Sequence, residues 1–327
     1  MVNDIVAIIQ SSRTFLVTSH VRLDGDALGS ELALSHMLRR LGKEVVVCNQ
    51  DETPAIYRFL PGTDAIVHAL NPGDRFDAAF ILDCSDLDRV GDHAAAIGSV
   101  TQTIVNIDHH ISNDRFAEYS LVDHGASSTG EIICRLLEPL EVPLTGDIAT
   151  NLYTAIMTDT GSFRYSNTSS ATLRLAARLV DGGADVRDIA ERVYESRPLA
   201  QIRLMGMALD TLELHEAGTI GSVTVTQEML HRAGALPEHT EGIVDLVRSV
   251  NGTEIALFYC EMADNDFKVS FRSKGDADVA RVAGAFGGGG HVNAAACRIE
   301  GDLTTVKKRL MDVIAMVRET ASSKGQR

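Results

Sequence analysis

The first half of the chain alternates short, continuous apolar runs with stretches in which apolar residues recur at helical spacing. This alternation is typical of β-α-β units and favours a parallel sheet. The runs are apolar at every position, as expected of strands that are buried on both faces. The predicted strands are 15–18, 45–47, 78–82 and 103–107, and the predicted helices are 27–41, 128–137 and 145–157.

The second half has a different pattern. Residues 185–214 have helical periodicity that is broken at Pro198, because proline cannot sit inside a regular helix. Further strands are predicted at 220–226, 254–261, 267–271 and 295–299, with a last helix at 303–317. A chain of 327 residues is long for one core. We therefore predict an α/β fold with a parallel-sheet domain at 1–185, a helical connector at 186–214 and a smaller mixed-sheet domain at 215–327.

Charge and composition limit the partners. The formal net charge is −15, whereas a protein that holds long nucleic acid needs a basic surface that displaces counterions. We expect no long nucleic acid partner. No apolar run could span a bilayer and the N-terminus does not resemble a signal peptide, so no membrane association is expected. The five cysteines stand singly, which fits reduced thiols in the cytoplasm. The sequence leaves open whether the chain forms a homodimer.

Side chains able to bind metal follow three of the predicted strands. In chain order these residues are His20, Asp24 and Asp26, then Asp83, then Asp108, His109 and His110. Asp159, just past a predicted helix, could reach the same place. Because the carboxyl ends of parallel strands share one edge of a sheet, where ligands bind, we expect these side chains to meet in one crevice.

Several carboxylates in one crevice repel one another and take up protons unless cations neutralise them. A mixture of carboxylate oxygen and imidazole nitrogen without thiolate suits Mn²⁺, with Mg²⁺, Co²⁺ and Zn²⁺ as alternatives. The ligands outnumber those that one ion needs, which favours two ions about 3.5–4 Å apart. Water between two such ions loses a proton near neutral pH, so we expect a metal-bridging hydroxide to attack phosphorus.

Each of these residues also has a purely structural interpretation. His20 could be a hydrogen-bonded strand-end histidine, and Asp24 and Asp26 could belong to a turn and a helix start. Asp159 could occupy a helix end, and Cys84 fits a small buried residue better than a nucleophile. Three adjacent titratable groups at 108–110, directly after a buried strand, are harder to explain in this way. The full set together favours a metal site.

Four parts of the chain resemble the four motifs of the DHH phosphoesterase superfamily, namely segment 20–26, Asp83, residues 108–110 and Asp159. Segment 286–295 resembles the signature of the first type of DHH-associated C-terminal domain. At this length the chain is similar to the bacterial nanoRNase and 3′-phosphoadenosine 5′-phosphate (pAp) phosphatase group. The resemblance implies a metal-dependent hydrolase that degrades short oligoribonucleotides, in 3′–5′ or 5′–3′ direction, and dephosphorylates pAp. Relatives of that group act on cyclic or linear di-AMP.

The resemblance also implies roles for individual residues. One ion would be held by His20, Asp24 and Asp83, and the other by Asp26, Asp83, His109 and Asp159, with Asp83 bridging. Asp108 would orient a histidine, as outer carboxylates commonly do. His110 would face the phosphate. Asp83, Asp108 and His110 are therefore the expected catalytic residues.

The second domain would bind the part of the substrate opposite the metals. Glycine amides can approach an anion closely, and arginine suits phosphate contact. On composition alone, the glycine block at residues 287–290 would be a flexible loop. Two positions depart from the family pattern, Leu23 in place of proline and Ala296 in place of glycine. The expected substrate-binding residues are Arg272, Ser273, Lys274, Gly288, Gly289, Gly290, His291 and Asn293.

Two other functions stay open. A manganese inorganic pyrophosphatase shares the first four motifs but carries a different C-terminal domain, without the glycine block and its histidine. A non-catalytic nucleotide-binding protein would have lost ligands, whereas every expected ligand position is filled here. The expected partners are short RNA oligonucleotides or small adenine nucleotides, and the sequence does not rank nanoRNA, pAp and di-AMP among them.

Overall fold

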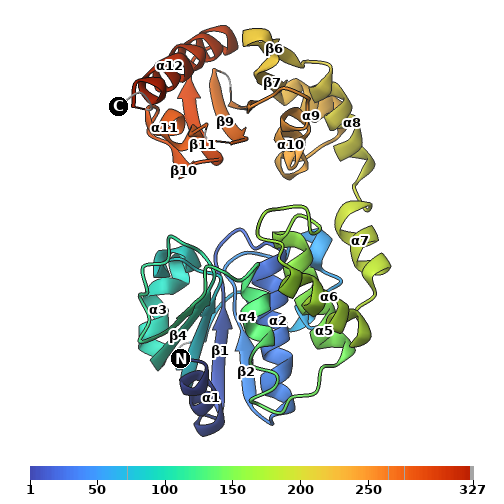
Figure 1. The fold of residues 1–327 in the computed structure, drawn as a ribbon, viewed down its shortest axis with the longest axis vertical. Coiled ribbons are helices and arrows are strands. Elements are labelled where there is room, and N and C mark those ends of the chain that lie inside the picture. Colours follow the sequence, from blue (N-terminus) through green and yellow to red (C-terminus); the bar gives the residue numbers. More distant parts are fainter. Residues whose placement is uncertain (72, 264, 276, 325–327) are drawn as a thin grey trace. The chain divides into compact units, whose positions relative to one another are not determined.

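The computed structural model describes residues 1–71, 73–263, 265–275 and 277–324, except for the side chains of His291 and of residues 319–324. The chain divides into two compact units, Met1–Ser196 and Arg197–Arg327, each visible in Figure 1. The division falls inside the predicted connector 186–214, between α7 (Val186–Tyr194) and α8 (Leu199–Leu209). The predicted α/β fold is confirmed, with a parallel sheet in the first unit and a mixed sheet in the second.

The first unit is built on a five-stranded sheet in the order β2-β1-β3-β4-β5, in which every pair of neighbours is parallel. The strands are β1 (Thr14–Thr18), β2 (Glu44–Val47), β3 (Phe76–Leu82), β4 (Thr101–Asp108) and β5 (Tyr119–Val122). The α-helices, besides α7, are α1 (Val2–Ser11), α2 (Gly25–Arg40), α3 (Ala94–Val100), α4 (Thr129–Cys134), α5 (Gly146–Asp159) and α6 (Ser170–Asp181).

Helices cover both faces of this sheet. Successive residues of a strand point to opposite faces, and in β1 Phe15 and Val17 are buried in a core shared with α2, α4 and α5. Leu16 is buried in a second core shared with α3, which lies across the sheet from α2 in Figure 1. This double coverage explains why the strands are apolar at every position.

The chain leaves the neighbouring strands β1 and β3 in opposite directions. From β1 it passes through α2 to β2 at one edge, and from β3 it continues to β4 and β5 toward the other edge. Such a reversal opens a crevice beyond the carboxyl ends of the two strands, where ligands bind in open α/β sheets. His20 follows β1 and Asp83 follows β3, so both residues stand at this point of the fold.

Local hydrogen bonds set the starts of two helices near the crevice. The Asp24 carboxylate accepts bonds from the amides of Asp26 and Ala27, at 3.1 and 3.0 Å, which starts α2 two residues before the predicted position. Ser128 caps α4 by accepting from the amide of Glu131, at 3.1 Å, at the residue where the sequence predicted a helix to begin. The Glu131 carboxylate accepts hydrogen bonds from the amide and the hydroxyl of Ser127.

The second unit contains a six-stranded sheet in the order β10-β11-β9-β8-β7-β6, in which only β7 and β8 are parallel. The strands are β6 (Glu213–His215), β7 (Ile220–Val225), β8 (Ile255–Ala263), β9 (Asp266–Ser273), β10 (Gly289–His291) and β11 (Ala294–Glu300). The helices, besides α8, are α9 (Gln227–Ala233), α10 (Ile243–Arg248), α11 (Val279–Gly284) and α12 (Leu303–Lys324). Among the described residues, no helix has the length and apolar character that a bilayer span requires.

Candidate metal centre

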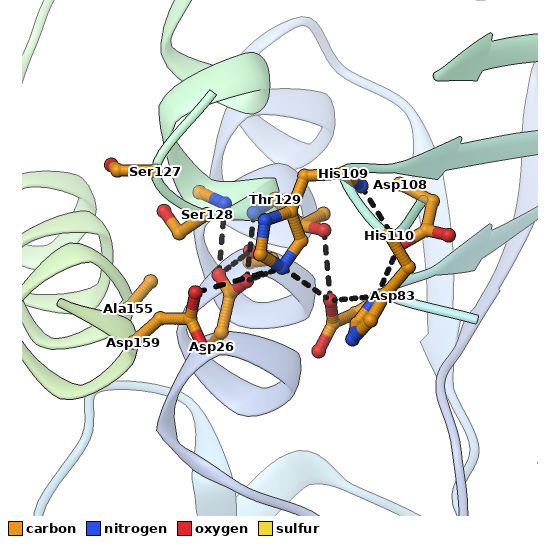
Figure 2. Close-up of polar contacts among 12 residues, drawn as sticks. Asp26, Asp83, Asp108, His109, His110, Ser127, Ser128, Thr129, Ala155 and Asp159 are labelled. Carbon is orange, nitrogen blue, oxygen red and sulfur yellow. Dashed lines mark hydrogen bonds and ion pairs between the residues drawn. The ribbon is translucent and has the colours of Figure 1, made fainter. Parts of the chain in front are cut away.

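The structure brings all six predicted metal ligands into the crevice of the first unit. His20 and Asp83 follow β1 and β3, Asp24 and Asp26 begin α2, His109 follows β4, and Asp159 is the last residue of α5. Figure 2 shows Asp26, Asp83, His109 and Asp159 converging from these separate elements. Their ligand atoms fall into two groups, His20 with Asp24 and Asp83, and Asp26 with His109 and Asp159. A third group, Asp83 with His109 and His110, overlaps both.

Asp83 faces both groups with different oxygens. Its Oδ2 lies 3.3 Å from Nε2 of His20, whose distance to Oδ2 of Asp24 is 3.9 Å. Its Oδ1 lies 3.7 Å from Nε2 of His109. That nitrogen is 3.8 Å from Oδ2 of Asp26 and 3.6 Å from Oδ2 of Asp159.

These separations fit shared coordination better than direct hydrogen bonding. Distances of 3.3–3.9 Å are long for a charge-assisted hydrogen bond. Adjacent oxygens of an octahedral ion, each about 2.1 Å from the ion, are about 3 Å apart. The six side chains therefore have both the donor chemistry and the spacing to hold divalent cations.

The start of α4 fixes Asp26. The amide of Thr129 donates to Oδ2 of Asp26 at 2.7 Å, and the amide of Gly130 donates to Oδ1 at 2.9 Å. Helix N-termini favour anionic groups in this way. The Thr129 hydroxyl donates to Oδ1 of Asp83 at 3.0 Å. A side chain at Gly130 would place Cβ 2.6 Å from Cβ of Ala155, so glycine is needed for the close packing of α4 on α5.

Thr129 and Gly130 were missed by the sequence analysis. The only signal for them was the predicted helix start at Ser128, since any helix N-terminus offers free amides. Their common partner, Asp26, lies 103 and 104 residues earlier in the chain, so the contact could not be read from local sequence.

The backbone of Asp83 is in the left-handed region, with φ 57°. This conformation is uncommon for residues other than glycine and is concentrated at functional sites. The Asp83 amide donates to the carbonyl of Ile107 at 3.0 Å, which ties the turn after β3 to the end of β4. The turn is thus held where its carboxylate meets the histidines that follow β1 and β4.

Burial and mutual repulsion oppose the simultaneous ionisation of the carboxyl groups in this site. Burial, followed by the charge of Asp159, raises the pKa of Asp26 to about 7. Burial, followed by the charge of Asp24, raises the pKa of Asp159 to about 7. Asp83 is fully buried, and its pKa lies well above the ordinary value because of burial and the charge of Asp26. Such a cluster is neutralised by protons or by cations.

Asp108 orients His110. The Asp108 carboxylate is completely buried and accepts a bond from Nδ1 of His110 at 2.7 Å, and another from the side-chain amide of Asn113 at 2.6 Å. Burial alone would raise the pKa of Asp108, but the bond from His110 lowers it overall. Burial opposes protonation of His110, yet the same bond raises its pKa. Because Nδ1 is engaged, Nε2 is the nitrogen left for another partner.

In the second unit, most of the predicted substrate-binding residues lie at one end of β9, β10 and β11. Arg272 pairs with Ala294, and Gly290 pairs with Ala295 on the other side of β11. The Ser273 amide donates to the carbonyl of Asn293 at 3.0 Å. Lys274 is exposed, Arg272 is half-buried, and the side chain of His291 lies outside the described residues.

Ser273 and Asn293 stabilise the loop that follows β9. The Ser273 side chain is buried and its hydroxyl donates to the carbonyl of Ala277 at 2.6 Å. The Asn293 amide group donates to Oγ of Ser273 at 2.9 Å and to the carbonyl of Gly275 at 3.0 Å. Both side chains are therefore engaged within the protein.

The glycine block also has a packing requirement. A Cβ at Gly288 would collide with the carbonyl oxygen of Ala296, and one at Gly290 with that of Ala294. Gly290 also has φ 143°, a conformation that other residues rarely adopt. A Cβ at Gly289 would meet open space. Close contact with β11 thus accounts for two of the three predicted glycines without a ligand.

Comparison with known proteins agrees with this arrangement. Residues 14–156 match the DHH family, N-terminal domain, and residues 222–323 match the DHHA1 domain. The bifunctional oligoribonuclease and PAP phosphatase NrnA of Thermus thermophilus is 35% identical over 303 residues, which cover 91% of this chain and 88% of that protein. The protein of the same name from Bacillus subtilis is 28% identical over 304 residues, covering 91% and 93%. The crystal structure of an exopolyphosphatase-related protein from Bacteroides fragilis superposes with a TM-score of 0.92 at 25% identity, covering 98% and 96%.

Proposed function

The chain belongs to the DHH family of phosphoesterases, and from this premise we propose that it is a two-cation hydrolase of short oligoribonucleotides and pAp. The observation that carries the proposal is the position of Asp83, which faces His20 with one carboxylate oxygen and His109 with the other. The names of two relatives that align with most of the chain support both substrate classes. Free thiols at the five described cysteines support a cytoplasmic location as part of the proposal.

The proposed ions are Mn²⁺, because carboxylate and imidazole ligands without thiolate suit that metal. His20, Asp24 and Asp83 would hold one ion, and Asp26, Asp83, His109 and Asp159 would hold the other. When bound, such ions polarise phosphoryl oxygens and lower the pKa of water. The protein's contribution is to fix the ligands, and it does so through the α4 amides at Asp26 and the Thr129 hydroxyl at Asp83.

His110 is the proposed acid. The Asp108 carboxylate holds the proton of the ring on Nδ1 and raises the pKa of His110, so the doubly protonated ring is favoured. Nε2 can then donate to a phosphoryl oxygen or to the leaving oxygen. His110 lies beside the metal ligands, with Nδ1 3.6 Å from Oδ1 of Asp83.

Arg272 and Lys274 are the proposed phosphate contacts in the second unit, since both are cations at the end of β9. Ser273 and Asn293 would hold the loop that presents them, and the open Gly289 leaves room for close approach of a ligand. With a net charge of −15, the chain lacks the basic excess that binding of long RNA requires, which favours short substrates. The match of residues 222–323 to the DHHA1 domain disfavours the pyrophosphatase alternative.

The test is a side-by-side turnover assay with Mn²⁺ on a ribodinucleotide, pAp, linear and cyclic di-AMP, and inorganic pyrophosphate. Asp83→Asn, which keeps the size of the side chain, is the matched control for contaminating nucleases. We expect turnover of the dinucleotide and pAp that disappears in the control. Turnover of pyrophosphate alone, or no turnover of any substrate by the Mn²⁺-loaded chain, would overturn the proposal.

A further inference from the structure

Glu31 is a buried acid that lies outside the ligand set. It sits in the middle of α2 with no exposed surface. Its Oε2 accepts a hydrogen bond from Nδ2 of Asn49 at 2.8 Å, and its Oε1 has no partner among the described residues. Burial of a carboxyl group in this way is costly, whereas an apolar side chain in the same place would avoid the cost. The acid therefore calls for an explanation other than packing.

Asn49 continues the pairing of β1 after β2 has turned away. The amide of Cys48 still donates to the carbonyl of Val17 at 3.0 Å, but the amide of Asn49 donates to Val67 instead. The Asn49 side chain replaces the backbone as the partner of this segment, because its Oδ1 accepts a hydrogen bond from the amide of Ser19 at 3.3 Å. The bond to Glu31 fixes the direction of this side chain, since Nδ2 facing the acid leaves Oδ1 facing Ser19.

Ser19 joins the two strand ends on either side of the crevice. Its hydroxyl donates to the carbonyl of Leu82 at 2.7 Å. Ser19 directly precedes His20, and Leu82 directly precedes Asp83. The hydrogen bonds thus run from Glu31 through Asn49 and Ser19 to the backbone beside both ligands.

We propose that Glu31 is a positioning residue for the metal centre, acting through Asn49 and Ser19 on the strand ends that carry His20 and Asp83. The inference rests on the proposed metal site. Burial raises the pKa of Glu31 to about 8, against the opposing effect of the Asn49 bond. Glu31 thus acts through the hydrogen bond that its Oε2 accepts from Asn49 and not through charge.

The experiment measures Mn²⁺ binding to the metal-stripped full chain by titration calorimetry, together with the thermal unfolding of the metal-free protein. Glu31→Leu and Asn49→Ala should each weaken Mn²⁺ binding by about tenfold or more, as supporting partners of metal ligands commonly do. Glu31→Gln keeps an acceptor for Asn49 and should bind Mn²⁺ like the wild type. The double variant should lose no more than either single variant, because the two residues act in series.

Leu34→Ala is the matched control, since Leu34 is buried in the core on the same helix and its apolar side chain takes no part in these hydrogen bonds. It should lower thermal stability and leave the Mn²⁺ dissociation constant unchanged. Wild-type Mn²⁺ binding in Glu31→Leu, or in Asn49→Ala if that leucine variant does not fold, would overturn the inference. So would a Glu31→Gln variant as weak as Glu31→Leu. Failure of the wild type itself to bind Mn²⁺ would instead refute the proposed function.

Discussion

The carboxylate of Asp108 accepts a hydrogen bond from Nδ1 of His110 at 2.7 Å, and Asp108 is completely buried while His110 is partly exposed. The pair therefore fixes the ring of His110 and leaves Nε2 available at the crevice. In the proposed mechanism the protonated ring is the acid, so activity should fall as pH rises through the pKa of His110.

Asp108→Asn should move this fall to lower pH. The substitution keeps the shape of the side chain but removes the charge that helps to raise the pKa of His110. The measurement is kcat against pH on a ribodinucleotide with Mn²⁺ for both proteins. A profile that stays in place in the variant would show that Asp108 does not govern the protonation of the acid.

His110→Ala should lower kcat by about 10²–10⁴-fold, the usual contribution of a general acid or base, with Mn²⁺ binding retained. His231→Ala, which removes an exposed histidine of α9, is the control and should have no effect. Calorimetric titration with Mn²⁺ distinguishes a general acid from a metal ligand at this position. Loss of an ion from His110→Ala would make this residue a ligand and contradict the division of labour with His109.

Asp83→Ala should remove both ions and all activity, because its two oxygens face the two ligand groups. Asp159→Ala affects one group only and should retain one ion. Elemental analysis of the purified variants gives the ion count. Two ions bound to Asp83→Ala with turnover near that of the wild type would rule out the bridging role.

Mn²⁺ should stabilise the protein more at pH 8 than at about pH 6. The folded-state pKa values of Asp26 and Asp159 are raised from 3.8 to about 7, so their contribution to stability is complete below 3.8 and is lost as pH rises through about 7. At pH 8 the metal-free protein therefore lacks this contribution to its stability. Protons also no longer compete with the cations for the carboxylates at that pH. Thermal unfolding with and without Mn²⁺ measures the difference, and a larger gain in Tm at the lower pH would contradict the argument.

Arg272→Ala should weaken nucleotide binding by about 1.5–3 kcal/mol, the range for a hydrogen bond to a charged group. Hydrolysis of p-nitrophenyl phosphate should be nearly unchanged, because that ester has no second phosphate or nucleoside to bind. Arg298→Ala, which removes an exposed arginine of β11, is the matched control. The measurement is kcat/KM on a dinucleotide, pAp and the activated ester. Equal losses on all three substrates would mean that Arg272 supports the fold.

The positions of the proposed ligands were easier to predict from the sequence than the groups that hold them in place. The strands of the first sheet were recognisable as apolar runs, and His20 and Asp83 follow directly from where those runs end. The amides of α4 and the partners of Asn49 were not predictable, because they join segments that are far apart in sequence. Strand β5, four residues with mixed polarity, and α11, six residues long, were also missed, since such short segments carry little periodicity.

The central claim is that two cations share Asp83, and anomalous diffraction at the manganese edge from crystals grown with Mn²⁺ tests it most directly. The account predicts two peaks about 3.5–4 Å apart, on either side of the Asp83 carboxylate. One should lie next to His20 and Asp24, and the other next to His109 and Asp159. A single peak, or two peaks that do not share Asp83, would contradict the account.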